Sequence, residues 1–107
     1  MTELIRNSLT ELAAMIKERV VSPVEVAEAY LDQISRVNSQ LNAIVTLSPD
    51  LLDRARESEA AVMRGENLGA LHGVPVTIKD TIETANLRTT SGSKIRSAHI
   101  PTHGEFQ

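Results

Sequence analysis

Two stretches near the start of the chain carry the signals that begin an amphipathic helix, and they constrain the fold more than any other feature. Ser8 and Glu11 have the spacing of a capping box, in which each side chain binds the other residue's backbone N–H, and Ser22 and Glu25 repeat it. Pro23 stands at the first helical position, where proline is well tolerated. Apolar residues then recur at helical spacing: Leu9, Leu12, Ala13, Ile16 and Val20 in the first stretch, and Ala27, Tyr30, Leu31, Ile34 and Val37 in the second. We therefore expect two helices, each with one buried face.

The residues that follow predict a third helix and two short strands. The second helix is expected to end near Asn38, and residues 41–47 form a β-rich run typical of a strand. The third helix should run from Pro49 to about Arg64 and end at Gly65. Alternating apolar residues predict a second strand over Val74–Ile78. The third helix is expected to bury Leu51, Ala55, Ser58 and Val62 and to expose Asp50, Asp53, Arg54, Arg56, Glu57 and Glu59.

These elements predict an α/β fold that the 107 residues do not complete. Three amphipathic helices and two strands expose more apolar surface than they cover together, and a two-stranded sheet is marginal in water. Residues 81–93 are rich in threonine and serine, as loops are, and residues 97–107 show no period. We expect the chain to be the opening portion of a larger α/β domain.

The composition excludes several classes of function. The chain has 11 lysines and arginines against 14 aspartates and glutamates, a net charge of −3, and no basic run, so it lacks a nucleic-acid signal. It has one tyrosine and one phenylalanine, too few to stack single-stranded bases. The absence of cysteine excludes disulfides and thiolate chemistry. No stretch approaches the roughly 18 apolar residues of a membrane span, and the polar start lacks a signal-peptide core, so we expect a cytoplasmic protein.

Two groups of residues resemble binding motifs but have simpler explanations. The three glycines within residues 65–73 match neither the dinucleotide nor the phosphate-loop spacing, so they are interpreted as turn glycines. His99 and His103 are four residues apart, like a metal-binding pair on a helix. Pro101 lies between them and disfavours that helix, so no metal site is expected.

Three further residues could carry chemistry and are interpreted in structural terms first. His72 precedes a turn glycine, and we expect it to be packed or hydrogen-bonded instead of acting as a base. Ser91 and Ser93 lack the G-x-S-x-G elbow in which a nucleophilic serine follows a strand. A nucleophile there stays open, while a loop that lies close to a ligand or another backbone segment is the favoured alternative.

Lys79 is the candidate for catalysis. It closes the second expected strand, in which Val74, Val76 and Ile78 share one face. A lysine beside a buried strand can be partly desolvated, and desolvation lowers a lysine's pKa so that its neutral amine can accept a proton. The same pattern also fits an exposed lysine at the end of an edge strand, which is the more common situation.

Four segments, in order along the chain, resemble motifs of one known family. Gly73–Asp80 reads GVPVTIKD and follows a G-[VI]-P-[VIF]-x-[IVL]-K-D pattern, and Thr89–Ser93 reads TTSGS and follows T-T-x-G-S. Upstream, Ser22–Val26 is similar to an S-x-x-E-[LV] helix start and Asn42–Val45 to an N-A-[FIV] strand. These are motifs of the amidase signature family, and the resemblance extends from about Leu9 to Ser93.

The resemblance implies a hydrolase of carbon–nitrogen amide bonds that uses a Ser–cis-Ser–Lys triad. Lys79 matches the triad lysine, which acts through the bridging cis-serine as the base for a serine nucleophile and returns the proton to the leaving amine. The family carries both serines in a later Gly/Ser-rich segment, and nothing after Ser93 resembles it. Ser91 and Ser93 belong to an earlier loop and do not replace them. The tail Pro101–Glu105 also departs from the family's pattern. Because the chain has the base but lacks the nucleophile and the oxyanion donors, we expect the 107 residues alone to be inactive.

The resemblance also implies a fold, a substrate class and partners. Residues 1–107 would form the N-terminal portion of a single amidase-signature domain, with helices and the first strands of a larger mixed sheet. The substrate would be a small-molecule linear amide, bound without cofactor or metal. The protein would act as a homodimer, or as part of the amide-hydrolysing component of a glutamine-dependent tRNA amidotransferase together with its partner subunits. A non-catalytic α/β fragment that pairs with another chain along its open sheet edge is the alternative from a different class.

Overall fold

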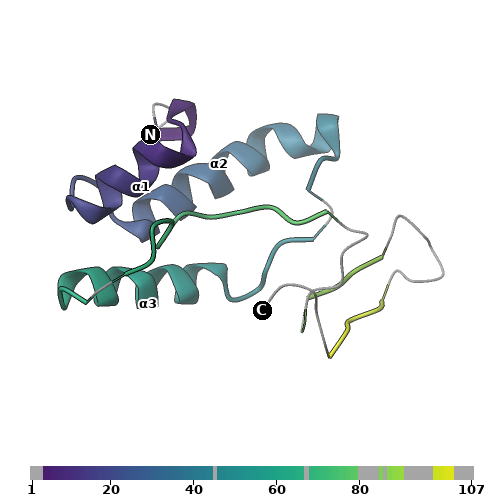
Figure 1. The fold of residues 1–107 in the computed structure, drawn as a ribbon. Coiled ribbons are helices and arrows are strands. Elements are labelled where there is room, and N and C mark those ends of the chain that lie inside the picture. The colour runs from purple at the N-terminus through teal and green to yellow at the C-terminus, as the bar shows by residue number, and fades with distance from the viewer. Residues whose placement is uncertain are drawn as a thin grey trace. The chain divides into compact units, whose positions relative to one another are not determined.

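A computed structural model of the protein describes residues 4–44, 46–66, 68–79, 85, 87–90 and 98–102. Its helices are the short 3-10 helix η1 (Leu4–Arg6) and the α-helices α1 (Leu9–Lys17), α2 (Pro23–Leu41) and α3 (Leu51–Met63) (Figure 1). The chain divides into a helical unit, residues 1–43 and 49–75, and a second unit, residues 44–48 and 76–107. Among the residues described, no helix is long and apolar enough to cross a membrane.

Both predicted capping boxes are present. The Ser8 hydroxyl accepts from the backbone N–H of Glu11 at 3.2 Å, and the Glu11 carboxylate accepts from the N–H of Ser8 at 3.1 Å. Ser22 and Glu25 form the same reciprocal pair, at 3.0 and 3.2 Å. These bonds satisfy N–H groups that no helical carbonyl can reach, so local sequence decides where α1 and α2 begin.

The end of α1 differs from the prediction. The helix stops at Lys17, and Arg19 then adopts a left-handed conformation with φ of 62°. The N–H of Val20 donates to the carbonyl of Met15 at 2.8 Å, a bond typical of a helix that ends in this way. Val20 was expected on the buried face, but it lies outside the helix and is 63% exposed. Leu9, at the other end of the expected stripe, is 45% exposed.

The other two helices agree with the prediction more closely. α2 extends beyond Asn38 to Leu41, where Asn42 in a left-handed conformation with φ of 50° ends it. The first residue of the expected 41–47 strand is therefore helical. α3 begins and ends just inside the predicted limits. Glu59, expected in solvent, is half-buried.

The core of the helical unit is aliphatic and is formed by all three α-helices. It consists of Leu12 and Ile16 of α1, Val26 of α2 and Val62 of α3, with Val21, Tyr30, Leu68 and Val74 half-buried around it. Val26, which the predicted stripe omitted, is fully buried beside Ala27. α2 packs against both η1 and α3, so its buried face is wider than one stripe.

Neither expected strand has formed among the residues that the structure describes. The described parts of 41–47 and 74–78 are neither helix nor strand apart from Leu41, and Leu87 makes an isolated β-bridge. Val76, in the middle of the second expected strand, is 70% exposed. A strand needs a neighbour that pairs with its backbone N–H and C=O groups, which a local alternating pattern cannot supply. The helical part of the α/β prediction is therefore observed, and the sheet stays a prediction.

Candidate functional site

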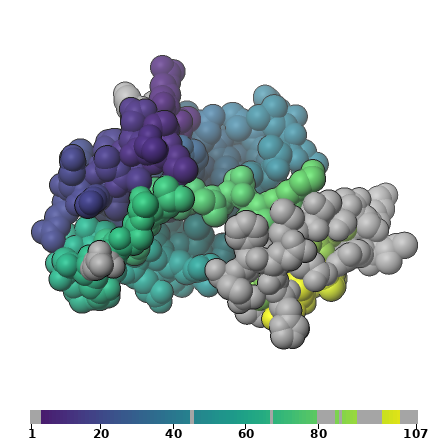
Figure 2. Space-filling model, viewed as in Figure 1, coloured from purple at the N-terminus to yellow at the C-terminus, as the bar shows by residue number. Residues whose placement is uncertain are grey.

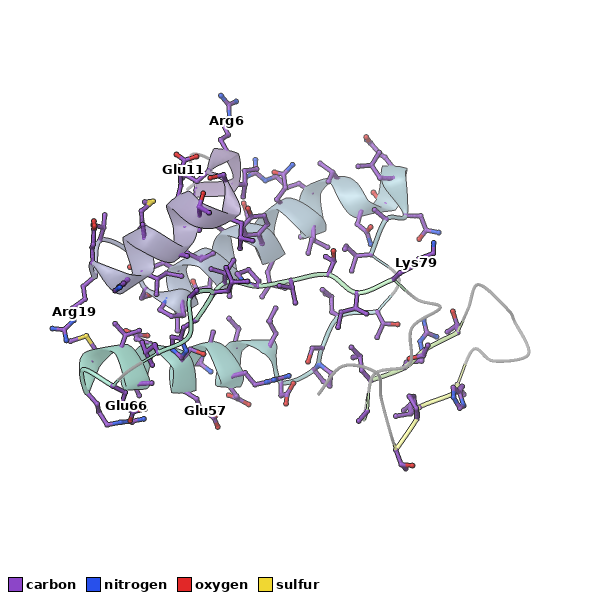
Figure 3. All side chains as sticks on the ribbon, viewed as in Figure 1. Arg6, Glu11, Arg19, Glu57, Glu66 and Lys79 are labelled. Carbon is purple, nitrogen blue, oxygen red and sulfur yellow. The ribbon has the colours of Figure 1, made fainter. Side chains whose placement is uncertain are left out.

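Lys79, the predicted base, lies at the end of the stretch 74–79 and is labelled in Figure 3. Its side chain is exposed, and it forms no hydrogen bond or ion pair with another described residue. Of the two interpretations left open by the sequence, the exposed lysine is the one observed. The burial that would favour a neutral amine is absent from the described residues, and the catalytic role of Lys79 stays a prediction.

His72 is hydrogen-bonded within the helical unit, as its place before a turn glycine predicts. Its Nε2 lies 2.9 Å from the backbone carbonyl oxygen of Ser58 in α3. A carbonyl only accepts, so Nε2 carries a proton and donates it to this bond. The N–H of His72 also donates to the carbonyl of Gly69 at 3.2 Å, which closes a turn. The histidine thus ties the loop that precedes Lys79 to α3.

Gly73 contacts α1 and lies so close to the start of α2 that a side chain there would clash with Pro23. A Cβ added to it would lie 2.7 Å from Cγ of Pro23 and 3.4 Å from Cδ1 of Ile16. Its φ of 81° is also one that L-residues rarely adopt. Gly65 has a positive φ of 70° but open space around it, which agrees with its predicted place at the end of α3. Figure 2 shows the teal-green residues directly after α3 lying against the purple surface of α1.

The second family motif begins at two buried threonines in the second unit. Thr89 and Thr90 are 2% and 5% exposed. The Thr89 hydroxyl donates to the carbonyl of Leu87 at 3.1 Å, and its N–H donates to the carbonyl of His99 at 2.9 Å. Buried hydroxyls are stable only when hydrogen-bonded, and these bonds meet that need for Thr89. The remaining motif residues, Ser91–Ser93, lie outside the described residues.

A second contact in this unit joins segments that are far apart in the sequence. Nε of Arg88 donates to the hydroxyl of Thr46 at 3.1 Å, 42 residues away. No local pattern predicts such a pair, because neither residue type nor spacing marks it. The contact and the Thr89–His99 bond bring three segments together directly before the serines of the TTSGS motif.

Two carboxylates of the helical unit have perturbed pKa values for simple reasons. The pKa of Glu11 is lowered by its bond from the Ser8 backbone N–H and, next, by the Ser8 hydroxyl. The pKa of Glu66 is lowered mainly by a hydrogen bond from Arg64, with smaller help from the charges of Arg64 and His72. Both residues are labelled in Figure 3 and are exposed. They stabilise local structure and are poor candidates for acid–base catalysis.

The helical unit also has a small cavity that contains none of the motif residues that follow α3. Its volume is about 190 Å³, and its lining consists of Arg19, Val21, Ser22, Pro23, Glu25, Glu59, Val62 and Met63. The Arg19 guanidinium donates to the carbonyl of Val62 at 3.1 Å, near the end of α3 where a cation is favourable. Within the described ranges, no group of three or more His, Asp or Glu residues could hold a metal ion. His103 lies outside these ranges, so the expectation that it forms no metal pair with His99 stays a prediction.

The comparison with protein families covers most of these features. The sequence model of the amidase family matches residues 25–105. The chain belongs to the amidase family. The matched range contains Lys79, Gly73 and both buried threonines, so the resemblance expected from the GVPVTIKD and TTSGS motifs is confirmed.

Three relatives of this amidase-family chain are each named as the A component of a glutamyl-tRNA(Gln) amidotransferase. The chain is 44% identical to the one from Carboxydothermus hydrogenoformans over 102 residues, which are 94% of this chain and 21% of that protein. It is 43% identical to the protein of the same name from Acidothermus cellulolyticus over 104 residues, 96% of this chain and 21% of the relative. The corresponding protein of Paenarthrobacter aurescens is 46% identical over 98 residues, 87% of this chain and 19% of the relative. The chain thus spans about one fifth of the length of the curated relatives that it matches.

Proposed function

We propose that this chain supplies the lysine base of an amide-hydrolysing enzyme and that Lys79 is that base. The observation that carries the proposal is the family match over residues 25–105, within which Lys79 lies near the end of the GVPVTIKD motif. Residues 1–107 would be the N-terminal portion of one amidase domain, in which residues 74–78 pair as a strand of the mixed sheet. The cytoplasmic location and the homodimer expected from the sequence stay predictions.

The proposed chemistry is a proton relay. The neutral Lys79 amine accepts a proton, through a bridging serine, from the serine that attacks the amide carbon. After attack, the same route returns the proton to the nitrogen that leaves, so the lysine ends in its starting state. The amine must be neutral at the start, because only a neutral amine can accept a proton. The proposal therefore requires Lys79 to be covered when the serines are in place, since loss of solvent favours the neutral amine.

The names of the relatives favour the amidotransferase over the free amidase among the activities that the motifs imply. Relatives at 43–44% identity that cover nearly all of this chain are named as the A component of a glutamyl-tRNA(Gln) amidotransferase. We infer that the enzyme hydrolyses the side-chain amide of glutamine and works with the other subunits of such a complex. A free amidase acting on small linear amides is the second candidate, supported by the family match alone.

A chimera tests both candidates. Residues 1–107 would be joined to the downstream remainder of the Carboxydothermus relative and produced with the other subunits of that amidotransferase. Ammonia release would then be measured from glutamine, acetamide and benzamide. Release from glutamine alone supports the amidotransferase, and release from the simple amides supports a free amidase. A folded chimera that is inactive on all three refutes the enzyme and favours the non-catalytic fragment.

Two substitutions in the chimera isolate the role of Lys79. Lys79→Arg keeps the positive charge, but a guanidinium cannot be deprotonated in a protein and so cannot act as a base. Lys79→Arg and Lys79→Ala should each lower the rate by about 10²–10⁴-fold, the usual contribution of a general base. Lys17→Ala, at the exposed end of α1, is the matched control and should leave the rate unchanged. Activity of Lys79→Arg within about tenfold of the parent, a loss of only ~1.4 kcal/mol, would exclude Lys79 as the base.

The 107-residue chain itself provides a further test. It contains Lys79 without a recognised nucleophile segment, so it should release no ammonia from any of the three amides. Activity in this chain would point to Ser91 or Ser93 as the nucleophile.

A further inference from the structure

We propose that Gly73 is a positioning residue for Lys79. Because it has no side chain, the backbone at this point can dock on α1 and α2, and the lysine segment leaves the helical unit from a fixed position. The inference rests on the proposed function, since it needs Lys79 to act as a base. It adds the requirement that helices distant in sequence hold that base in place.

The contact between Gly73 and Pro23 leaves no room for a Cβ atom. An added Cβ would lie 2.7 Å from Cγ and 3.2 Å from Cβ of Pro23, and 3.4 Å from Cδ1 of Ile16. Pro23 is the first residue of α2 and is almost completely buried, as is Ile16. A proline ring has no free rotamer with which to move aside. Any side chain at Gly73 must therefore displace the loop, because the helices are held by their own core.

The residues on either side of Gly73 are anchored to the same unit. His72 bonds to the Ser58 carbonyl of α3, and Val74 packs against the hydrophobic core. Pro75 then limits the backbone of Val74 to extended conformations and fixes its own φ near −65°. Three consecutive anchors and a proline thus set both the position and the direction of the chain where it leaves the helical unit.

Downstream of Pro75 the described residues provide no comparable support. Val76, Thr77 and Lys79 are exposed. Neither Thr77 nor Lys79 bonds to another described residue. Lys79 follows Val74 by five positions, so even a fully extended chain keeps the lysine within about 18 Å of the last anchor. The proposal requires that a shift of this anchor be passed along the short covalent stretch to the base, and misplacing a catalytic group by ~1 Å can lower a rate about 100-fold.

Alanine at each of three glycines provides the test, with matched controls inside one loop. In the chimera, Gly73→Ala should lower kcat by about 100-fold and change KM by less than about threefold. Gly65 also has a positive φ, but an added Cβ would meet nothing within 4 Å. Gly69 has neither a positive φ nor a close neighbour, so Gly65→Ala and Gly69→Ala should both retain kcat. The folded fraction of each variant would be measured by circular dichroism at the assay temperature. A merely structural role would lower that fraction and leave kcat per folded molecule unchanged.

A smaller residue at position 23 tests whether the clash with Pro23 causes the loss in kcat. Pro23→Ala removes the Cγ atom that an alanine at position 73 would meet at 2.7 Å, so Pro23→Ala/Gly73→Ala should regain at least about tenfold in kcat over Gly73→Ala. If Gly73→Ala does not fold, the comparison is made between Pro23→Ala/Gly73→Ala and Pro23→Ala. The double variant should then have the lower kcat. Equal kcat for Gly73→Ala and Gly65→Ala, or a loss that trimming does not reverse, would overturn the inference.

The two proposals fail in distinguishable ways. If Lys79→Arg remains active, the proposed function fails, and the positioning role fails with it. If Lys79→Arg is inactive while the Gly73 and Gly65 variants behave alike, Lys79 is the base and only the positioning role is wrong.

Discussion

Replacing Gly73 with alanine in the 107-residue chain should be among the most destabilising small changes that the structure allows. Two costs act together. A left-handed conformation costs an L-residue roughly 1–2 kcal/mol, and Gly73 has a φ of 81°. The added methyl group also overlaps the Pro23 ring at 2.7 Å, and overpacking of this kind costs about 1–3 kcal/mol. Alanine restricts the unfolded chain more than glycine does, and this stabilises the folded state by about 0.4–1 kcal/mol. We therefore expect the free energy of unfolding to fall by about 2–4 kcal/mol in total.

Two other glycines separate these costs. Gly65 has a φ of 70° and nothing within 4 Å of an added Cβ, so Gly65→Ala should carry the conformational cost alone, about 1 kcal/mol. Gly69 has neither constraint, and Gly69→Ala should be neutral or stabilise the chain by up to about 1 kcal/mol. The order of stability is therefore Gly69→Ala, Gly65→Ala, Gly73→Ala, from most to least stable.

Urea denaturation followed by far-ultraviolet circular dichroism measures the effect. The free energy of unfolding in water comes from linear extrapolation, and equal slopes across the variants would show that the same surface is exposed on unfolding. A Gly73→Ala variant no less stable than Gly65→Ala would refute the reasoning, because it would mean that Pro23 does not lie against this loop.

Three further predictions concern the helices. In urea denaturation, Leu12→Ala should lower the free energy of unfolding by about 2–5 kcal/mol and Leu9→Ala by under about 1 kcal/mol. Both leucines lie in α1, but only Leu12 is buried, so similar losses would contradict the assigned core. Ser22→Ala should cost about 1 kcal/mol through loss of the cap, and Ser22→Asp, which can still cap, should restore most of it. The pKa of Glu11 is lower in the folded chain than its usual 4.5, so its contribution to stability is full above the unfolded pKa and is lost as pH falls through the folded pKa. Between about pH 5 and 3, the free energy of unfolding should therefore fall less for Glu11→Gln than for the parent. Glu57→Gln is the control, and an equal fall in the two variants would contradict the assignment.

Local patterns predicted the starts of the helices and failed where distant contacts decide the outcome. The capping boxes at Ser8 and Ser22 lie within four residues each, so they are readable from the sequence. Val20 continued the apolar spacing of α1, but the left-handed turn at Arg19 ended the helix before it. An arginine at such a position carries no sequence signal, since few residues other than glycine, asparagine and aspartate adopt it.

The candidate site shows the same division. Lys79 was identified from its place at the end of the expected strand and from the GVPVTIKD motif, and the turn glycines were identified from their spacing; the family match agrees with the motif. The sequence did not predict three contacts: Gly73 against Pro23, the bond from His72 to Ser58, and the pair formed by Arg88 and Thr46. Each joins segments separated by 14 to 50 residues, and spacing rules apply only within one helix or strand.

The sequence by itself determined the helical starts, the aliphatic character of the core and the family to which the chain belongs. These properties depend on hydrogen bonds within one helical turn, on residue type, and on motifs that are contiguous in the chain. Only the tertiary structure decided which apolar residues are buried, which glycine admits no side chain, and that Lys79 is exposed here. Those outcomes depend on which surfaces meet when the helices pack, and a side chain's burial and solvation are set by neighbours that its own segment does not specify.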